Sequence, residues 1–246
     1  MLKRLKFVFP FAALAILVGL FVLSRQTVEE VPREKLALMT SLPLYWGEAS
    51  EFAELASGQG ELPWVRARLE ERYDLYPIDS LSTEIELGRE AFDRILIAQP
   101  RAISPEDNVA LDEWVSQGGR LLLVIDPLLT GSYSVPLGDP SHPTTVGLIP
   151  PVLERWGIGI RYDENQAFAL QSVESGGLQL PFAMAGEAHL LGSGTATCTI
   201  SHEGILARCK LGKGRVTMLV DAALFELHQE SSNSRKSLLK LTEMAF

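Results

Sequence analysis

An uncharged apolar run near the N-terminus constrains this 246-residue chain more than any other feature. Residues 7–23 (FVFPFAALAILVGLFVL) carry no charged side chain. A run of this length lies at the lower end of what crosses a bilayer as a helix. Pro10 falls in the first turn of such a helix, where a missing N–H is tolerated. The run therefore predicts one transmembrane helix.

Basic residues around the run predict its orientation. Lys3, Arg4 and Lys6 precede it, whereas only Arg25 follows closely. Because positively charged flanks stay in the cytoplasm, the N-terminus is expected inside and the rest of the chain outside. We therefore expect a single-pass protein of the cytoplasmic (inner) membrane, with a periplasmic or otherwise extracytoplasmic C-terminal domain.

A cleaved signal peptide is the alternative interpretation of the same run. Such a peptide usually has a shorter apolar core and needs small residues before the cleavage point. Here the run ends in residues 22–26 (VLSRQ), which make a poor cleavage site, so the pattern favours an uncleaved anchor. No cysteine follows the run, which excludes anchoring as a lipoprotein.

The charge of the chain is unevenly distributed. Four of its 22 basic residues and none of its 31 acidic residues lie in the first 26 positions, which leaves a net charge of −13 for the remainder. Such a surface repels nucleic acid and, beyond the anchor, anionic lipid. We therefore expect contact with the membrane through residues 7–23 and no nucleic-acid partner.

The sequence divides into a cytoplasmic tip and anchor (1–26), a polar linker (27–34) and one extracytoplasmic domain (35–246). The clearest part of the domain is an apolar strand at 94–98, an amphipathic helix and a second apolar strand at 120–126. Ser104 suits the N-cap of that helix, and Pro105 suits its first position. A right-handed crossover would make the two strands parallel, which favours a doubly wound α/β domain.

The remaining patterns extend this α/β prediction. Residues 166–212 are rich in short β patterns and are expected either to extend the sheet or to form a small β lobe. Residues 130–143, rich in Gly, Pro and Ser, predict a loop. Further strands are expected at 35–41, 75–78, 158–160 and 215–220, and further helices at 62–73, 146–156 and 237–246.

The two cysteines fall within a predicted hairpin. With a two-residue turn at 203–204, Ile200 would face Ala207 and Cys198 would face Cys209. Opposed positions in an antiparallel pair suit a disulfide, and an extracytoplasmic domain permits one. The alternative is two reduced thiols in a different register. Either way the spacing is not Cys-x-x-Cys, so a structural bond is expected rather than a redox centre.

Motifs for catalysis are absent from the sequence. There is no nucleophile elbow, no phosphate-binding loop and no dinucleotide-binding glycine motif, and none of the four histidines has a metal-ligand spacing. The glycines at 192–194 and 212–214 fit turns. We therefore predict no catalytic residue, no metal and no cofactor.

Polar residues at the ends of the predicted strands are the candidate ligand-binding site, because ligands of open α/β sheets bind outside the carboxyl ends of the strands. Asp126 and Asp221 could hold a metal or sugar hydroxyls. Alternatively, both residues cap helices or pair with basic residues on neighbouring loops, and the pattern favours capping. The five candidates are Thr40, Ser41, Gln99, Asp126 and Asp221.

Three aromatic residues beside a proline turn, Tyr45, Trp46 and Trp64, either line a groove or fill the core. Aromatic residues in such places belong more often to the core.

A resemblance rests on residues 93–127 (DRILIAQPRAISPEDNVALDEWVSQGGRLLLVIDP). A strand leads to a turn and a helix with Leu-Asp-x-x-Val, and Gly-Gly-Arg then begins an apolar strand ending in Asp-Pro. Residues 153–158 (LERWGI) and 212–221 (GKGRVTMLVD) add to it. These segments resemble the periplasmic domain of gliding-motility-type ABC transporter auxiliary proteins, over about residues 35–240. The resemblance implies a flavodoxin- or amidotransferase-like sheet, related to class I glutamine amidotransferases.

The sequence departs from this pattern in two ways. The relatives usually have a longer ectodomain and often a second, C-terminal transmembrane helix, which the residues up to Phe246 do not show. Neither Cys198 nor Cys209 follows an apolar parallel strand, where amidotransferases carry their nucleophile. The resemblance therefore implies a catalytically inactive binding domain.

The resemblance and the residues together predict an accessory subunit of an ABC-type transport system, with permease and ATPase subunits as partners. Two alternatives remain open: an envelope scaffold protein, and a hydrolase that uses Asp126 and Asp221.

Overall fold

The computed structural model of the chain describes residues 33–48, 62–82 and 92–246. The predicted transmembrane run at 7–23 lies outside these ranges. Within them, no helix has both the length and the apolarity needed to cross a membrane.

A mixed, mostly parallel sheet of seven strands forms the centre of the described region, in the order β2-β1-β3-β4-β11-β10-β9. The first five strands run parallel to one another, and β10 and β9 complete the sheet in antiparallel fashion. The predicted mostly parallel α/β sheet is thereby confirmed. The strands are β1 (Glu34–Thr40), β2 (Tyr73–Pro77), β3 (Arg94–Ala98), β4 (Arg120–Val124), β9 (Thr197–Ser201), β10 (Leu206–Leu211) and β11 (Gly214–Leu219).

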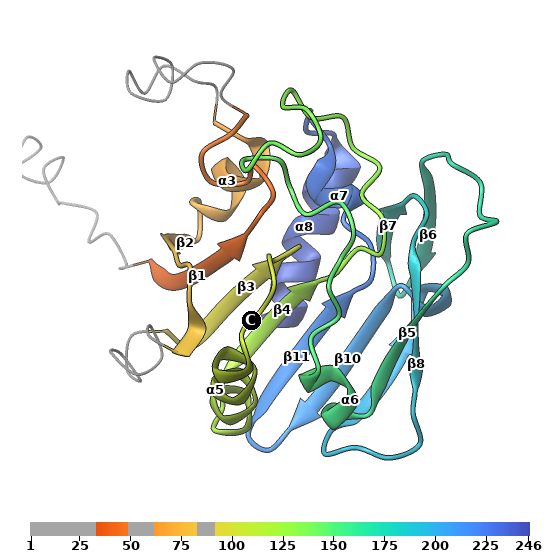
Figure 1. Ribbon diagram of the computed structural model, residues 1–246. Coiled ribbons are helices and arrows are strands. Elements are labelled where there is room, and N and C mark those ends of the chain that lie inside the picture. Colours follow the sequence, from red (N-terminus) through yellow and green to blue (C-terminus); the bar gives the residue numbers. More distant parts are fainter. Residues whose placement is uncertain (1–32, 49–61, 83–91) are drawn as a thin grey trace, which may run out of the picture. The chain divides into compact units, whose positions relative to one another are not determined.

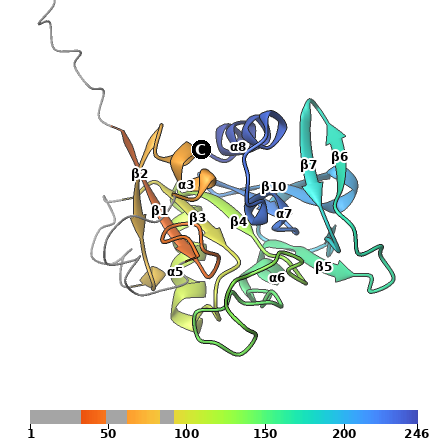
Figure 2. The same cartoon turned by 90° about the horizontal axis from the view of Figure 1, so that it is seen from above.

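Both faces of the sheet are buried at its central strands β3 and β4, which explains why these strands read as unbroken apolar runs. Alternate residues of β3 point to opposite sides: Ile95 belongs to one core cluster and Leu96 to the other. Helices α5 (Pro105–Ser116) and α6 (Val152–Trp156) cover one face. Helices α3 (Trp64–Leu69), α7 (Ala223–Glu226) and α8 (Ser232–Ala245) cover the other. Figures 1 and 2 show α5 and α8 on opposite sides of the sheet.

The unit formed by β3, α5 and β4 agrees with the sequence prediction. The hydroxyl of Ser104 accepts a hydrogen bond from the Asp107 N–H at 3.0 Å, and Pro105 is the first residue of α5. The chain leaves the helix through Gly118, whose φ of +128° favours glycine. Strands β3 and β4 then pair in parallel as direct neighbours.

Two predicted helices are shorter than expected. The helix predicted at 62–73 ends at Leu69, because Tyr73 begins β2 and packs its ring against that of Phe246 at 5.8 Å. The helix predicted at 146–156 begins only at Val152. Its proline pair at 150–151 lacks two N–H donors and disfavours helical geometry in the residue before it.

The predicted β-rich segment, 166–212, combines both expected outcomes. Its last two strands, β9 and β10, extend the main sheet. Its other three strands lie in two separate two-stranded ladders: β6 (Gln171–Ser175) pairs with β7 (Leu178–Phe182), and β8 (Gly186–Leu190) pairs with β5 (Ile158–Tyr162), which precedes the segment. Strand β7 lies against α8, where the Ser237 hydroxyl donates a hydrogen bond to the Gln179 carbonyl.

The β9–β10 hairpin places Ile200 opposite Ala207 and Cys198 opposite Cys209, and a disulfide joins the two cysteines. Its connection is not a two-residue turn but a 3₁₀ turn at His202–Gly204, in which Glu203 has a φ of +55°. The buried His202 ring lies with Nε2 3.0 Å from the Leu178 carbonyl, which fixes the end of the hairpin to β7.

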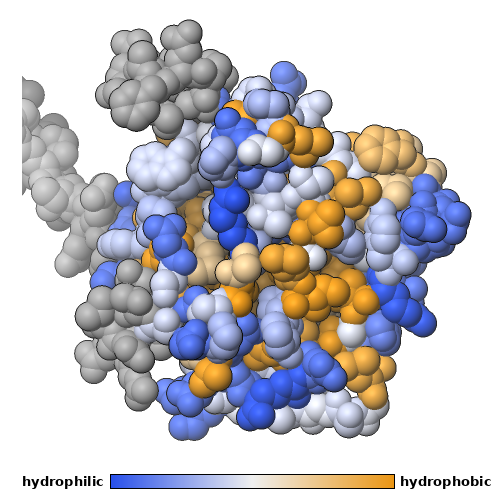
Figure 3. Space-filling model, viewed as in Figure 1, coloured by the Kyte–Doolittle hydropathy of each residue, from blue (hydrophilic) through white to orange (hydrophobic). Residues whose placement is uncertain are grey.

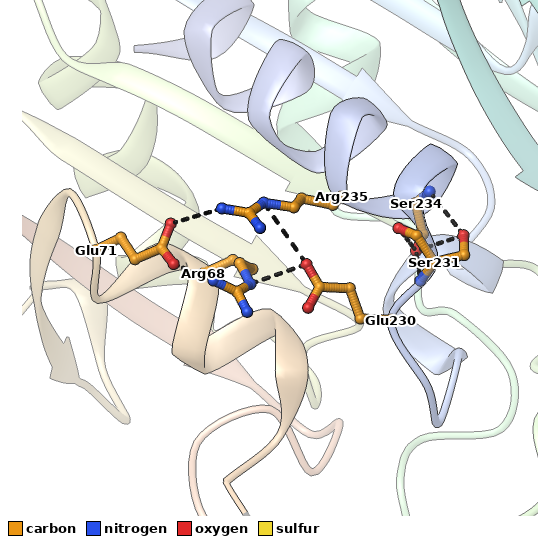
Figure 4. A network of polar contacts seen from close by, with 6 residues as sticks. All are labelled: Arg68, Glu71, Glu230, Ser231, Ser234 and Arg235. Carbon is orange, nitrogen blue, oxygen red and sulfur yellow. Dashed lines mark hydrogen bonds and ion pairs between the residues drawn. The ribbon is translucent and has the colours of Figure 1, made fainter.

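A polar network joins α3 to the start of α8 (Figure 4). Arg68 Nε lies 2.8 Å from Glu230 Oε1, and Arg235 lies between Glu230 and Glu71 at 3.7 and 3.6 Å. Each partly exposed ion pair contributes little to stability, so the main effect of the network is to position α3 relative to α8. The network holds α3 beside the strand ends described next.

Candidate functional site

The carboxyl ends of β1, β3, β4 and β11 meet at the upper edge of the sheet in Figure 1, where the candidate polar residues lie. The Ser41 hydroxyl donates to the Gln99 carbonyl at 2.5 Å and accepts from the Thr144 N–H at 3.0 Å. Thr40 Oγ1 accepts from the Leu42 N–H at 2.9 Å. Both hydroxyls therefore hold loops in place.

Gln99, which follows β3, ties the end of β4 to the loop at Thr144 with its side chain. Its amide nitrogen donates to the carbonyls of Asp126 and Thr144 at 3.0 and 2.8 Å, and its amide oxygen accepts from the Asp126 N–H at 2.8 Å. The residue is fully buried and has a φ of +46°, which a non-glycine residue seldom adopts. Gln99 is therefore a bracing residue beneath the surface.

The two candidate carboxylates accept backbone hydrogen bonds with both of their oxygens. Asp126 accepts from the N–H groups of Leu128 and Ala222, each at 2.9 Å. Asp221 accepts from those of Ala183 and Ala223, at 2.9 and 2.7 Å. Neither is an N-cap, because no helix directly follows Asp126 and the residue before α7 is Ala222. They cross-link β4, β11 and the loops beside them.

Both carboxyl groups are almost completely buried, and this burial shifts their pKa values. Burial raises the pKa of Asp126 well above its usual value, and the neighbouring charge of Asp221 raises it further. Burial also raises the pKa of Asp221, against the lowering effect of its two backbone hydrogen bonds. The charge of Glu226 acts in the same direction on both groups.

The stability of the domain is therefore expected to fall as pH rises from about 4 through the folded-state pKa values of this pair. A raised folded-state pKa means that the folded protein holds the proton more tightly, so its contribution is complete below the unfolded pKa and is lost above the folded one. Substituting Asp221→Asn removes one titrating group and the repulsion, and should flatten this decline. Urea unfolding at several pH values between about 5 and about 8 measures how the free energy of unfolding changes with pH in the wild type and in the variant.

Asp107, another buried carboxylate, does not interfere with that comparison. Burial alone would raise the pKa of Asp107, but hydrogen bonds from Ser82, Ser104 and Ser80 hold it below its usual value, so its contribution is lost only under more acidic conditions. A wild-type stability that rises across the window, or an equal slope in the Asp221→Asn variant, would contradict the paired-carboxyl explanation.

Above these bracing residues lies a hollow of about 510 Å³, here named the strand-end hollow. Trp46 at its edge is 70% exposed, so this residue lines a groove rather than filling the core. Thr40 and Ser41 line the hollow, whereas Gln99, Asp126 and Asp221 do not. Its other main lining residues are Tyr45, Glu48, Asp79, Arg101, Tyr133 and Ser134.

A second hollow of about 630 Å³ adjoins the first and shares Glu48 and Tyr133 with it. The Tyr133 hydroxyl donates to Glu226 Oε1 at 2.5 Å, and the Gly131 N–H donates to the same oxygen at 2.9 Å. Burial and the charge of Glu226 raise the pKa of Tyr133. No sequence pattern indicated this pair, because Tyr133 lies in a loop and Glu226 in a short helix far along the chain.

Within 33–48, 62–82 and 92–246, no group of three or more His, Cys, Asp or Glu side chains is placed to hold a metal ion. The exposed groups of the strand-end hollow are an aromatic surface, one guanidinium and two carboxylates.

Several solved structures are weakly similar to this chain. One is the exo-beta-1,4-mannosidase Op5Man5 from Opitutaceae bacterium strain TAV5, at 13% identity and a TM-score of 0.48 over 87% of this chain; the chain spans only 35% of that enzyme. Another is a putative ThuA-like protein from Parabacteroides merdae, at 12% identity and a TM-score of 0.42, over 87% of this chain and 90% of that one. A third is the cytoplasmic protein STM1381 from Salmonella typhimurium, at 11% identity and a TM-score of 0.45, over 87% and 100%.

No curated protein shows significant sequence similarity to the chain. A family of sequences does match: the one described as ABC-type uncharacterized transport system, over residues 33–181. That match spans more than half of the 246 residues, from the start of β1 into β7. The chain belongs to this family of ABC-type transport system proteins.

Proposed function

We propose that this protein is a membrane-anchored, non-catalytic accessory subunit of an ABC-type transport system. The observation that carries the proposal is the family match over residues 33–181. The residues at 93–127 further support an auxiliary protein of the gliding-motility type. The subunit would bind a partner or a transported compound outside the cytoplasm, with permease and ATPase subunits as its neighbours.

The anchor at 7–23 supports a place beside a permease. Its basic flank, Lys3, Arg4 and Lys6, supports a position of the domain on the extracytoplasmic side of the membrane. Residues 24–33 join the run to Glu34, where β1 begins. Ten residues reach at most about 35 Å when fully extended. The start of the domain would therefore stay within the reach of a neighbouring membrane subunit.

The buried carboxylates support a binding function over hydrolysis. A hydrolytic pair must present its oxygens to a substrate or a water. All four oxygens of Asp126 and Asp221 accept backbone hydrogen bonds instead, and both residues are at most 3% exposed. The carboxylate hydrolase is therefore the weaker alternative.

An exposed apolar segment, defined by Val146, Leu148 and Ile149, supports contact with a partner. These three side chains are 57, 51 and 50% exposed. Figure 3 shows apolar side chains gathered on this face of the molecule. The segment is held firmly, because the Gly147 N–H donates to the Asp126 carbonyl at 2.8 Å. Apolar surface presented in this way often marks a protein–protein interface.

Crosslinking of the full-length protein in its native membranes, followed by affinity capture and mass spectrometry, tests the proposal. We expect recovery of a permease and an ATPase subunit. The double substitution Leu148→Asp/Ile149→Asp should lower that recovery by about tenfold, because it places charge in an apolar contact. The matched control is Leu62→Asp, an exposed leucine outside the segment, which should leave recovery unchanged.

Two outcomes would decide against this function. Capture of other envelope proteins without any transporter subunit would favour the scaffold alternative. Equal recovery from the double variant and from Leu62→Asp would show that the exposed apolar segment is not the contact.

A further inference from the structure

We infer that the strand-end hollow binds a neutral saccharide. Identification of that saccharide as the compound recognised by a transport system rests on the proposed function, whereas the binding site itself does not. The inference depends on the position of the hollow, its aromatic wall, its polar wall and its charge.

The position and size of the hollow suit a small ligand. It lies over the carboxyl ends of the strands, the usual place of ligand sites in open α/β sheets. Its volume of about 510 Å³ falls in the range of small-molecule pockets. Its floor is rigid, because the hydroxyls of Thr40 and Ser41 are held by backbone groups.

The aromatic wall is fixed in place although it faces solvent. The Arg66 guanidinium lies 4.0 Å from the centre of the Tyr45 ring and donates to the Tyr45 carbonyl at 2.5 Å. Tyr45 in turn contacts Trp46 edge-on, with ring centres 4.7 Å apart. Trp46 thus presents a supported indole that is 70% exposed. A flat apolar ring of this kind stacks favourably on the C–H face of a sugar ring, which removes both surfaces from water.

The polar wall offers both hydrogen-bond donors and acceptors. The Arg101 guanidinium uses Nη2 on the Pro140 carbonyl at 2.7 Å and has further N–H groups for a ligand. Asp79 is exposed, and within the ranges that the structure describes no residue donates to its carboxylate. Hydroxyl groups of a sugar both donate and accept, so they match this combination.

The charge of the hollow separates a neutral sugar from other ligands. The carboxylates of Glu48 and Asp79 outnumber the single guanidinium of Arg101, which disfavours phosphates and other anions. Proteins recognise cationic ligands with cages of several aromatic faces. Here the Arg66 guanidinium already covers the Tyr45 ring, and the exposed Trp46 indole is a single face rather than a cage. A neutral molecule with hydroxyl groups and an apolar face remains.

The test begins with an array of neutral oligosaccharides probed with the full-length protein in detergent. The best binder is then titrated in solution by isothermal titration calorimetry, which does not depend on Trp46 as a reporter. We expect Trp46→Ala to weaken binding at least about tenfold and Trp46→Phe to retain most of it, since phenylalanine keeps a stacking face. The matched control is Phe168→Ala, which removes an aromatic ring that is 73% exposed elsewhere and should bind like the wild type.

The inference is overturned if no neutral glycan binds above the Trp46→Ala background, or if choline or glucuronate binds and neutral sugars do not. It is also overturned if Trp46→Ala binds as tightly as Phe168→Ala. The capture experiment distinguishes this failure from that of the proposed function, because Trp46→Ala should still recover the transporter subunits. If the wild type recovers transporter subunits but binds no glycan, only the saccharide inference is wrong. If it binds a glycan but recovers no transporter subunit, only the proposed transport function is wrong.

Discussion

Replacing Asp126 with alanine is expected to lower the free energy of unfolding of the α/β domain by about 3 kcal/mol. The substitution leaves two backbone donors, the N–H groups of Ala222 and Leu128, without their acceptor at a place where the side chain is fully buried. Each buried donor without a partner costs about 1–3 kcal/mol. Loss of the repulsion from Asp221 offsets part of that cost. Urea unfolding at neutral pH measures the difference.

Two further variants isolate the cause. Asp126→Asn keeps one acceptor oxygen and removes the charge, so it should cost less than the alanine variant. Asp163→Ala is the matched control, because Asp163 accepts from the Asn165 N–H two residues on, just as Asp126 accepts from Leu128, but on the exposed surface. Exposed substitutions of this kind change stability by about 0.5 kcal/mol or less.

The relative destabilisation of the Asn and Ala variants also distinguishes a structural role of Asp126 from a role in catalysis. If Asp126→Asn destabilises as much as Asp126→Ala, the acceptor oxygen that asparagine keeps contributes nothing, and the bracing explanation is wrong. A near-neutral alanine variant would contradict it as well. Either result would return Asp126 to the set of groups available to a substrate, as the hydrolase alternative requires.

The sequence was most informative where local and long-range signals agree. The strands at 94–98 and 120–126 are apolar on both sides, and a helix with a serine cap and a glycine exit lies between them, so each signal indicated the same unit. The prolines at 150–151 show the limit of periodicity. Their apolar neighbours fit a helical face, but the missing N–H groups let only Val152–Trp156 become helical.

The sequence predicted the location of the site but not which of its side chains face the hollow. The rule that ligands bind at strand ends located Thr40 and Ser41 at the hollow. It could not show that Asp126 and Asp221 turn inward, because their partners, Ala222 and Ala183, are set by the packing of distant loops. The exposure of Trp46 was still harder to predict, because it depends on how Arg66 and Tyr45 stack beneath it.

Loss of the Cys198–Cys209 bond is expected to lower the free energy of unfolding by about 3 kcal/mol, the entropy of closing a loop of this length. The double substitution Cys198→Ala/Cys209→Ala avoids leaving a lone thiol. Strand β9 is the edge strand of the sheet and pairs only with β10 there, so its amides should exchange with solvent faster in the variant. Thermal unfolding and hydrogen exchange measure the two effects.

Reductant provides the control for this prediction. It should lower the melting temperature of the wild type toward that of the double variant, and it should leave the variant unchanged. An equal shift in both proteins would mean that reductant acts elsewhere. A variant as stable as the wild type would show that the strand pairing alone holds the hairpin.

The same bond bears on where the domain resides, because disulfides persist in oxidising compartments and are rare in the cytoplasm. Thiols blocked in intact cells, before lysis, can be counted by mass spectrometry. Blocking of neither Cys198 nor Cys209 is the result expected for an extracytoplasmic domain behind the anchor at 7–23. Blocking of both would place the domain in a reducing compartment, and the orientation inferred from Lys3, Arg4 and Lys6 would then be wrong.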